Sequence, residues 1–137
     1  MLPFVEQERY DELLWACDVN FVRGEDSCVR AQWAGKPFVW QIYPQHDAVH
    51  WQKLQAFLNL YGAPLGEAKQ AMQDLWREWN DEGAAGEAWG AFIAARSELD
   101  LRAHEWMREL AANNLALNLL DFSREIGKMR AFKSKGQ

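Results

Sequence analysis

The most constraining feature of the sequence lies in residues 19–43, where two strand-like runs flank a short helical pattern. The first apolar run ends at Val22, and residues 37–43 are rich in β-branched and aromatic side chains. Gly24 and Gly35 bound the helical pattern between them. This order of strand, turn, helix and strand is compact for a parallel βαβ unit. The sequence therefore predicts an α/β fold with its ligand edge at the carboxyl end of the strands.

The turn after the first predicted strand carries groups that attract anions. We expect Asp26 or Ser27 to cap the following helix, because both residue types are preferred helix caps. The N–H groups of Ser27, Cys28 and Val29 would then be free at the positive end of the helix. Such an end favours an oxyanion, and the spacing is typical of α/β proteins that hold phosphate.

Two charged side chains flank this turn. Arg23 adds a guanidinium fork that suits a diphosphate better than a carboxylate. Glu25 beside a phosphate costs electrostatic energy unless it faces sugar hydroxyl groups, so we interpret it as a sugar-facing acceptor. An ordinary capped turn, with Arg30 exposed and Glu25 solvated, also explains these residues. Their chemistry alone leaves both interpretations open.

Two longer stretches, residues 4–27 and 30–45, closely resemble the bacterial protein-arginine rhamnosyltransferases that modify elongation factor P, the EarP family. The resemblance is specific over the first half of the chain and is one of pattern in the helical remainder. It implies an inverting GT-B glycosyltransferase that moves L-rhamnose from dTDP-β-L-rhamnose to an arginine side chain of elongation factor P, without a metal or other cofactor.

In that family the donor binds the C-terminal Rossmann-like domain. The acceptor-binding domain, with the aspartate proposed as general base, lies in an N-terminal half that has no counterpart in these residues. The chain therefore resembles a C-terminal, donor-binding piece, a truncated Rossmann-like domain. We expect no rhamnosyl transfer by this chain alone.

The resemblance also assigns site residues. Phe4, Gln7 and Tyr10 correspond to the family's contacts with the nucleoside. The contacts with the diphosphate and sugars correspond to Arg23, Gly24, Glu25, Asp26 and Ser27, and Glu25 matches the family's essential, catalytic glutamate. The residue types agree in part with the nucleoside assignment, because the rings of Phe4 and Tyr10 could each stack on a pyrimidine base. Both could equally pack in the core.

One departure from the family pattern stands directly after these residues. Cys28 occupies a position where the family usually has an aromatic residue. The exchange leaves the phosphate-facing backbone intact, and it predicts a gap in the packing beneath the turn.

The pattern changes near residue 46. We expect one domain over residues 1–137, with a nucleotide-sugar-binding βαβ part at 1–45 and a helical part at 46–137. The predicted elements are a strand at 2–5, a loop at 80–86 and helices at 10–17, 48–61, 66–79, 87–112 with a break near 97–100, and from 113 onward. In the last helix Leu115, Leu119 and Phe122 form an apolar stripe that we expect to be partly uncovered.

Composition excludes several classes of function. The chain has 137 residues, of which 49% are hydrophobic, enough to bury a core. Its net charge of −5 argues against general nucleic-acid binding, and we interpret the basic residues at 128–135 as a solvated helix end. No stretch is long and apolar enough to span a membrane, and no signal peptide precedes the first helix. With two cysteines, these observations favour the cytoplasm.

Other candidate sites are weaker. His46 and His50 have helical spacing, and His104 or Cys28 is a distant third ligand, but we expect Asp47 to cap that helix and predict no metal site. Cys17 and Cys28 lack metal or redox spacing and are expected to be buried thiols. The eight tryptophans are expected to pack in the core and at interfaces.

Three hypotheses follow for the whole chain. The first is the donor-binding half of a protein-arginine rhamnosyltransferase. The second is a helical protein-interaction domain without catalysis, and the third is a nucleotide-sugar-binding module without an acceptor. Titration with dTDP separates the second hypothesis from the other two.

Overall fold

The computed structural model describes residues 6–82 and 86–113, apart from the side chains of Gln7 and Glu82. Phe4, the strand expected at 2–5, the last helix with its apolar stripe, and the basic residues at 128–135 lie outside the described residues. The chain divides into two units, residues 1–107 and 108–137. All elements described below lie in the first unit, except for the end of the last described helix.

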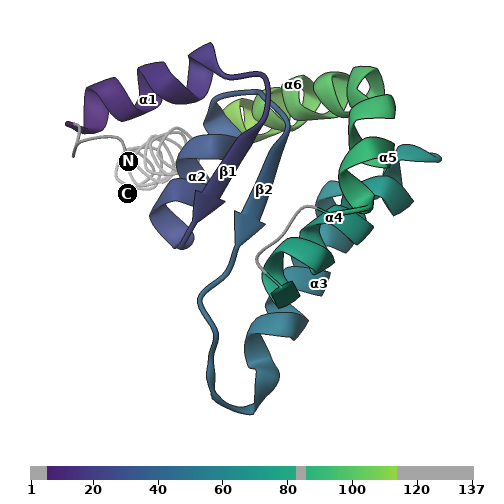
Figure 1. Ribbon diagram of the computed structural model, residues 1–137. Coiled ribbons are helices and arrows are strands. Elements are labelled where there is room, and N and C mark those ends of the chain that lie inside the picture. The colour runs from purple at the N-terminus through teal and green to yellow at the C-terminus, as the bar shows by residue number, and fades with distance from the viewer. Residues whose placement is uncertain (1–5, 83–85, 114–137) are drawn as a thin grey trace, which may run out of the picture. The chain divides into compact units, whose positions relative to one another are not determined.

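The described elements follow the predicted order of helix, strand, helix, strand and then helices (Figure 1). They are α1 (Gln7–Ala16), β1 (Asn20–Arg23), α2 (Glu25–Trp33), β2 (Phe38–Gln41), the 3-10 turn η1 (His46–Ala48), α3 (Val49–Tyr61), α4 (Ala68–Glu82), α5 (Ala88–Ala94) and α6 (Arg96–Ala112). The α/β prediction is confirmed at this level. Among the described residues, helix predominates over strand.

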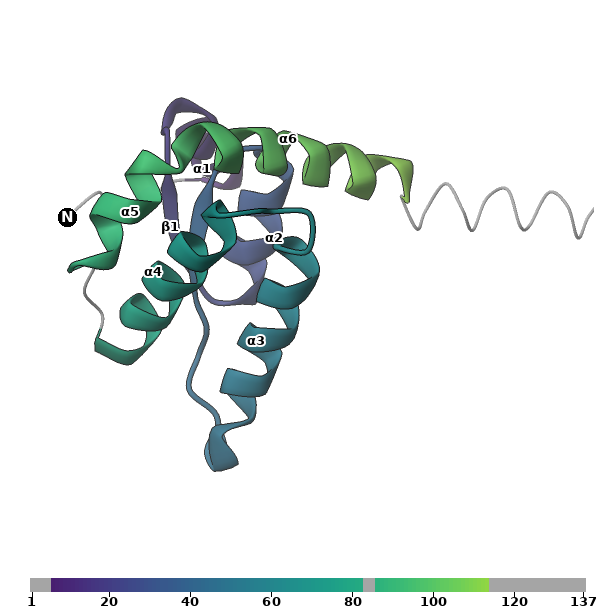
Figure 2. The same cartoon turned by 90° about the vertical axis from the view of Figure 1, so that its right-hand side faces the viewer.

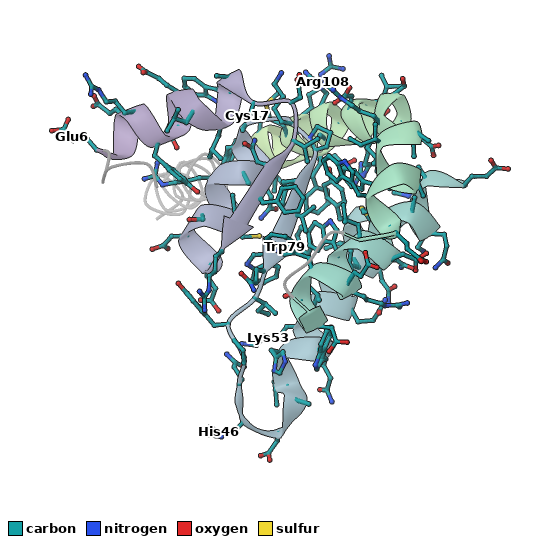
Figure 3. The ribbon with its side chains drawn as sticks, in the orientation of Figure 1. Glu6, Cys17, His46, Lys53, Trp79 and Arg108 are labelled. Atoms are coloured by element: carbon teal, nitrogen blue, oxygen red, sulfur yellow. The ribbon has the colours of Figure 1, made fainter. Side chains whose placement is uncertain are left out.

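The two strands form a parallel pair, as predicted. Asn20 pairs with Phe38 and Arg23 pairs with Gln41, so the carboxyl ends of β1 and β2 lie level. The helix α2 connects them and packs on both strands, and α1 packs on α2. Both strand arrows in Figure 1 point toward the start of α2, which places the predicted ligand edge there. Cys17, labelled in Figure 3, lies toward the opposite end of β1.

Several helix boundaries differ from the predicted ones. The helix α2 begins at Glu25, with Gly24 as its N-cap, so the prediction that Asp26 or Ser27 caps it is wrong. The helix α4 continues through Glu82, so the start of the expected loop at 80–86 is helical. The expected break in the long helix falls at Ala95, between α5 and α6 and slightly earlier than predicted.

The core of the first unit is built around an aromatic cluster, which we define as Phe38, Phe57, Tyr61, Trp76 and Trp106. Phe57 stacks on Trp76 with the ring centroids 5.7 Å apart, and Phe38 lies 5.3 Å from Trp76. Tyr61 and Trp106 meet edge to face at 5.4 Å. This cluster joins β2 to α3, α4 and α6, and the turned view in Figure 2 shows these helices from a second side.

A buried arginine completes the cluster. Arg102 is 3% exposed, and its Nε donates a hydrogen bond of 2.6 Å to the backbone oxygen of Tyr61. Its guanidinium carbon lies 5.3 Å from the centre of the Tyr61 ring and 5.1 Å from that of Trp106. These contacts satisfy a charge that would otherwise be costly to bury.

One side chain of β1, Phe21, packs on α4 and α5. Phe21 meets Trp79 edge to face, with the ring centroids 4.6 Å apart, and lies 5.8 Å from Trp89. The predicted core role is confirmed for Trp40, Trp76 and Trp106, which are buried. Trp15 and Trp33 are 58% and 43% exposed, so they do not pack in the core of the described residues. The prediction of two buried thiols is also wrong for Cys17, which is exposed.

Candidate nucleotide-sugar site

Gly24 forms the junction between β1 and α2 and determines the geometry of the site. Its N–H donates to the backbone oxygen of Gln41 at 3.0 Å, which extends the pairing of the strands by one residue. Its own oxygen accepts hydrogen bonds from the Trp40 indole at 2.9 Å and from the Cys28 N–H at 3.2 Å. The backbone has a φ of 81°, a left-handed region that favours glycine.

The N-terminus of α2 lacks a side-chain cap in this structure. The first amides of an α-helix have no acceptor within the helix, and here these belong to Glu25, Asp26 and Ser27. This corrects the predicted set, because the Cys28 N–H already bonds to Gly24. The helix starts earlier than predicted, but its uncapped amides still lie at the carboxyl edge of the sheet, where the helix dipole favours an anion.

Tyr43 covers this junction and was missed by the sequence analysis. The Arg23 guanidinium carbon lies 5.3 Å from the centre of the Tyr43 ring. A Cβ added to Gly24 would lie 2.7 Å from the same ring, so the glycine also makes room for the tyrosine. The available signal was an aromatic residue soon after the second predicted strand, at the sheet edge where ligands bind in α/β proteins.

The acidic residues of the turn line an open pocket. Glu25 and Asp26 are exposed, and with Ile42, Tyr43 and Gln45 they surround a volume of about 270 Å³. Uncapped amides thus lie beside carboxylates. This arrangement can bind a phosphate through the amides and hydroxyl groups through the acids.

The helix α1 packs on α2 and contacts Arg30, in the last turn of α2. Arg30 of α2 forms two hydrogen bonds of 2.8 Å with the Asp11 carboxylate of α1. Asp11, Arg30 and Asp26 line a second pocket of about 530 Å³, together with Trp15, Val29 and Trp33. Arg30 is therefore paired, whereas the ordinary-turn interpretation had it merely exposed.

The structure brings together part of the predicted site. Arg23, Gly24, Glu25, Asp26 and Ser27 are consecutive at the β1–α2 junction. Tyr10, which is half-buried, is adjacent to Asp11 on the helix that packs against α2. Gln7 is the first residue of α1, and Phe4 lies outside the described residues. The donor contacts and the catalytic role of Glu25 stay predictions.

Electrostatics distinguish Cys28 and Arg30 in this region. Burial raises the pKa of the Cys28 thiol to about 12, although a contact from Gln32 opposes the shift. The Asp11 hydrogen bond raises the pKa of Arg30 above its ordinary value. Cys28 is therefore a protonated, unreactive thiol at neutral pH, beneath the first turn of α2. The predicted gap around it stays a prediction.

The histidine pair does not extend to a metal centre within the described residues. Nδ1 of His50 accepts a hydrogen bond of 3.0 Å from the backbone N–H of Gln45. In residues 6–82 and 86–113 no three histidine, cysteine or acidic side chains group as metal ligands. Asp47 has a φ of 62° within η1 and does not cap α3, whose N-cap is Ala48, so that prediction is wrong. His46, labelled in Figure 3, is the first residue of η1, beyond the end of β2.

Comparison with known proteins decides the family. Residues 1–124 match the model of the Elongation-Factor P (EF-P) rhamnosyltransferase EarP. The chain belongs to the EarP family. It is 48% identical to a protein-arginine rhamnosyltransferase of Pseudomonas putida over 126 residues, which are 90% of this chain and 33% of that protein. A Pseudomonas aeruginosa protein of the same name is 44% identical over 124 residues, covering 89% of this chain and 33% of the relative.

A solved structure agrees with these sequence relatives. It was determined in work on EarP-mediated arginine glycosylation of translation elongation factor EF-P, and it shares 45% sequence identity and a TM-score of 0.75 with this EarP-family chain. The match covers 90% of this chain and 39% of the other. The EarP-family chain thus spans about a third of the length of the curated relatives it matches. No helix in the described part of the chain is both long and apolar enough to cross a membrane.

Proposed function

We propose that this chain is the donor-binding part of an inverting GT-B glycosyltransferase with a Rossmann-like donor domain. The proposed enzyme transfers L-rhamnose from dTDP-β-L-rhamnose to an arginine side chain of elongation factor P. Membership of the EarP family supports this proposal, and the relatives are named protein-arginine rhamnosyltransferases. The acceptor is a translation factor, so the reaction would take place in the cytoplasm.

One observation of the structure carries the proposal. The uncapped amides of α2, beside Arg23, lie at the carboxyl edge of two parallel strands. In α/β proteins this edge is where nucleotides bind, and helix N-termini bind phosphate there. Gly24, which is buried under the Tyr43 ring, turns the chain from β1 into α2 at this edge. The geometry thus supports a phosphorylated ligand.

The chemistry of transfer divides into two tasks. The dTDP leaving group develops negative charge, which Arg23 and the α2 amides can stabilise by charge-assisted hydrogen bonds. The acceptor arginine is cationic at neutral pH, and its nitrogen lone pairs are delocalised, so carboxylates must orient and activate it. Glu25 lies beside the proposed sugar position and serves the donor. We expect the general base to lie outside this chain, so the chain alone binds donor without transferring rhamnose.

Calorimetric titration of the 137-residue chain tests donor binding. We expect dTDP and dTDP-β-L-rhamnose to bind at a single site. Glu25→Gln should weaken the binding of dTDP-β-L-rhamnose more than the binding of dTDP, because the carboxylate is proposed to face the sugar. Glu12→Gln, which removes an exposed carboxylate from α1, is the charge-matched control. Absence of heat with either ligand would contradict the proposal and favour a helical interaction domain.

An activity assay tests the second part of the proposal. Mass spectrometry of elongation factor P incubated with donor and this chain alone should show no added rhamnose. A rhamnosylated arginine would contradict the expectation that the general base lies elsewhere.

A further inference from the structure

Asn80, in the last turn of α4, holds the outer edge of β2. Its Nδ2 donates hydrogen bonds of 2.8 Å to the backbone oxygens of Trp40 and Trp76. Its Oδ1 accepts a hydrogen bond of 2.9 Å from the backbone N–H of Ile42. One amide side chain thus connects α4 to backbone groups on both sides of Gln41.

These contacts reproduce the hydrogen-bonding pattern of a parallel strand. Gln41 directs its backbone oxygen toward β1, where it accepts the Gly24 N–H. Its neighbours Trp40 and Ile42 therefore direct their backbone groups to the other edge of β2. In a parallel ladder the residue opposite Gln41 would donate to the Trp40 oxygen and accept from the Ile42 N–H. The Asn80 amide supplies this donor and acceptor.

This bridge controls where the chain goes after the strand. β2 ends at Gln41, and the residues that follow line the pocket of about 270 Å³ beside Glu25 and Asp26. Tyr43, one residue beyond the Asn80 contact, lies against Gly24 and Arg23. Ile42 is 4% exposed, so its backbone is held in place while the next side chain reaches the surface.

We propose that Asn80 is a positioning residue of the nucleotide-sugar site. It acts through the backbone of Ile42, which directs Tyr43 onto the Gly24–Arg23 junction and so keeps the guanidinium beside the α2 amides. The inference rests on the proposed donor-binding function. It is distinct from that function because Asn80 is in α4 and acts on the site only through β2.

Two substitutions test the role of Asn80 in the full chain. Asn80→Ala removes all three hydrogen bonds. Asn80→Asp keeps the size of the side chain and the oxygen that accepts from Ile42, but it loses the hydrogen bonds to the Trp40 and Trp76 oxygens. It is a second test variant in case Asn80→Ala does not fold. Leu99→Ala is the matched control, because Leu99 is a buried residue of α6 whose loss lowers stability through the core.

Two measurements are made on each variant below its melting temperature. The first is the dTDP dissociation constant, which we expect to rise about tenfold in Asn80→Ala and to stay within about twofold of wild type in Leu99→Ala. The second is NMR of the free protein. The Ile42 amide should exchange faster, and the nuclear Overhauser contacts of the Tyr43 ring with Gly24 should weaken, in Asn80→Ala but not in Leu99→Ala.

The outcomes separate this inference from the proposed function. If wild type binds dTDP and the Asn80 variants bind as Leu99→Ala does, Asn80 is only a structural residue and the inference is overturned while the proposed function stands. If wild type binds no dTDP, the proposed function fails and the inference fails with it. Unchanged Ile42 exchange in Asn80→Ala would overturn the positioning mechanism whatever the affinities.

Discussion

The aromatic cluster and the β1–α2 junction show opposite designs within one small unit. In the cluster, Trp76 is fully buried and Arg102 has its charge covered by rings and a backbone oxygen. At the junction, the first turn of α2 has no side-chain cap, and Arg23, Glu25 and Asp26 are exposed. Backbone contacts hold the junction in place, whereas its side chains are left open.

This difference separates stability from binding. The cluster contributes buried apolar area, which dominates the free energy of folding. The junction contributes little burial and concentrates groups that need an anion as partner. We therefore expect substitutions in the cluster to change stability at constant affinity, and substitutions of exposed junction residues to change affinity at constant stability.

Trp76→Ala should produce the largest effect, in the cluster. Removing a buried tryptophan leaves a cavity and should lower the free energy of unfolding by about 3–5 kcal/mol. Chemical denaturation measures it. Trp76→Phe is the conservative control and should cost much less, because it keeps a ring and removes the indole N–H, which lacks a partner among the described residues. Equal losses for the two variants would show that the cluster is not closely packed.

Arg23→Ala should produce the largest effect at the junction. Loss of a charge-assisted hydrogen bond to phosphate should weaken dTDP binding about 10- to 100-fold, corresponding to roughly 1.5–3 kcal/mol. The melting temperature should hardly change, because Arg23 is exposed. Calorimetry measures the affinity, with Arg77→Ala as a charge-matched control on α4. A matching loss in the control would mean that net charge, rather than this position, governs binding.

Gly24→Ala should break the separation, because this residue serves both roles. The left-handed backbone disfavours a Cβ by roughly 1–2 kcal/mol, and the added atom would also meet the Tyr43 ring. We expect lower stability and weaker dTDP binding together. Gly90→Ala, in α5 where a Cβ would meet nothing within 4 Å, is the control and should lose neither. Full retention of stability in Gly24→Ala would contradict the strained junction.

High pH should change the free energy of unfolding by a smaller amount. The change comes from two buried groups that can lose a proton, the Cys28 thiol at the junction and the Tyr61 hydroxyl in the cluster. Burial raises the pKa of Cys28 from 9.0 to about 12, and burial also raises the pKa of Tyr61. Above about pH 9 the unfolded Cys28 thiol loses its proton while the folded one keeps it. The unfolded state then binds fewer protons, so the free energy of unfolding falls as pH rises toward 12.

Denaturation in Cys28→Ser and wild type between pH 7 and 11 tests this dependence. The slope attributable to the thiol should be absent in the variant. A thiol reagent provides an independent measurement, since at pH 8 exposed Cys17 should react and Cys28 should stay unmodified until the protein unfolds. Rapid modification of both cysteines in the folded protein would contradict the buried, protonated thiol.

The sequence was sufficient to predict the parallel βαβ unit, because apolar runs and two glycines mark its parts locally. It misplaced the start of α2, since Asp and Ser are stronger caps in general than glycine, and the cap here is a left-handed glycine covered by the Tyr43 ring. It also missed Tyr43. The direction of the chain at Tyr43 depends on a hydrogen bond between Ile42 and Asn80, which are 38 residues apart. The sequence pattern had assigned Asn80 to a loop.

The sequence pattern also failed to predict which side chains of the short helices are exposed. Trp15 of α1 and Trp33 of α2 line the same open pocket, and neither local pattern identified their outward faces. The assignment of Phe4, Gln7 and Tyr10 to the nucleoside came from family resemblance. The sugar-facing role of Glu25 was one of two interpretations that its chemistry left open.

Amide chemical shifts during a dTDP titration test the central claim most directly. We predict that the backbone N–H signals of Glu25, Asp26 and Ser27 move together and saturate with dTDP, while thymidine, which lacks phosphate, leaves them unchanged. The N–H signals of Leu99 and Trp106 in α6 should stay fixed. If dTDP leaves the three amides in place, or if thymidine moves them equally, the N-terminus of α2 does not bind the diphosphate.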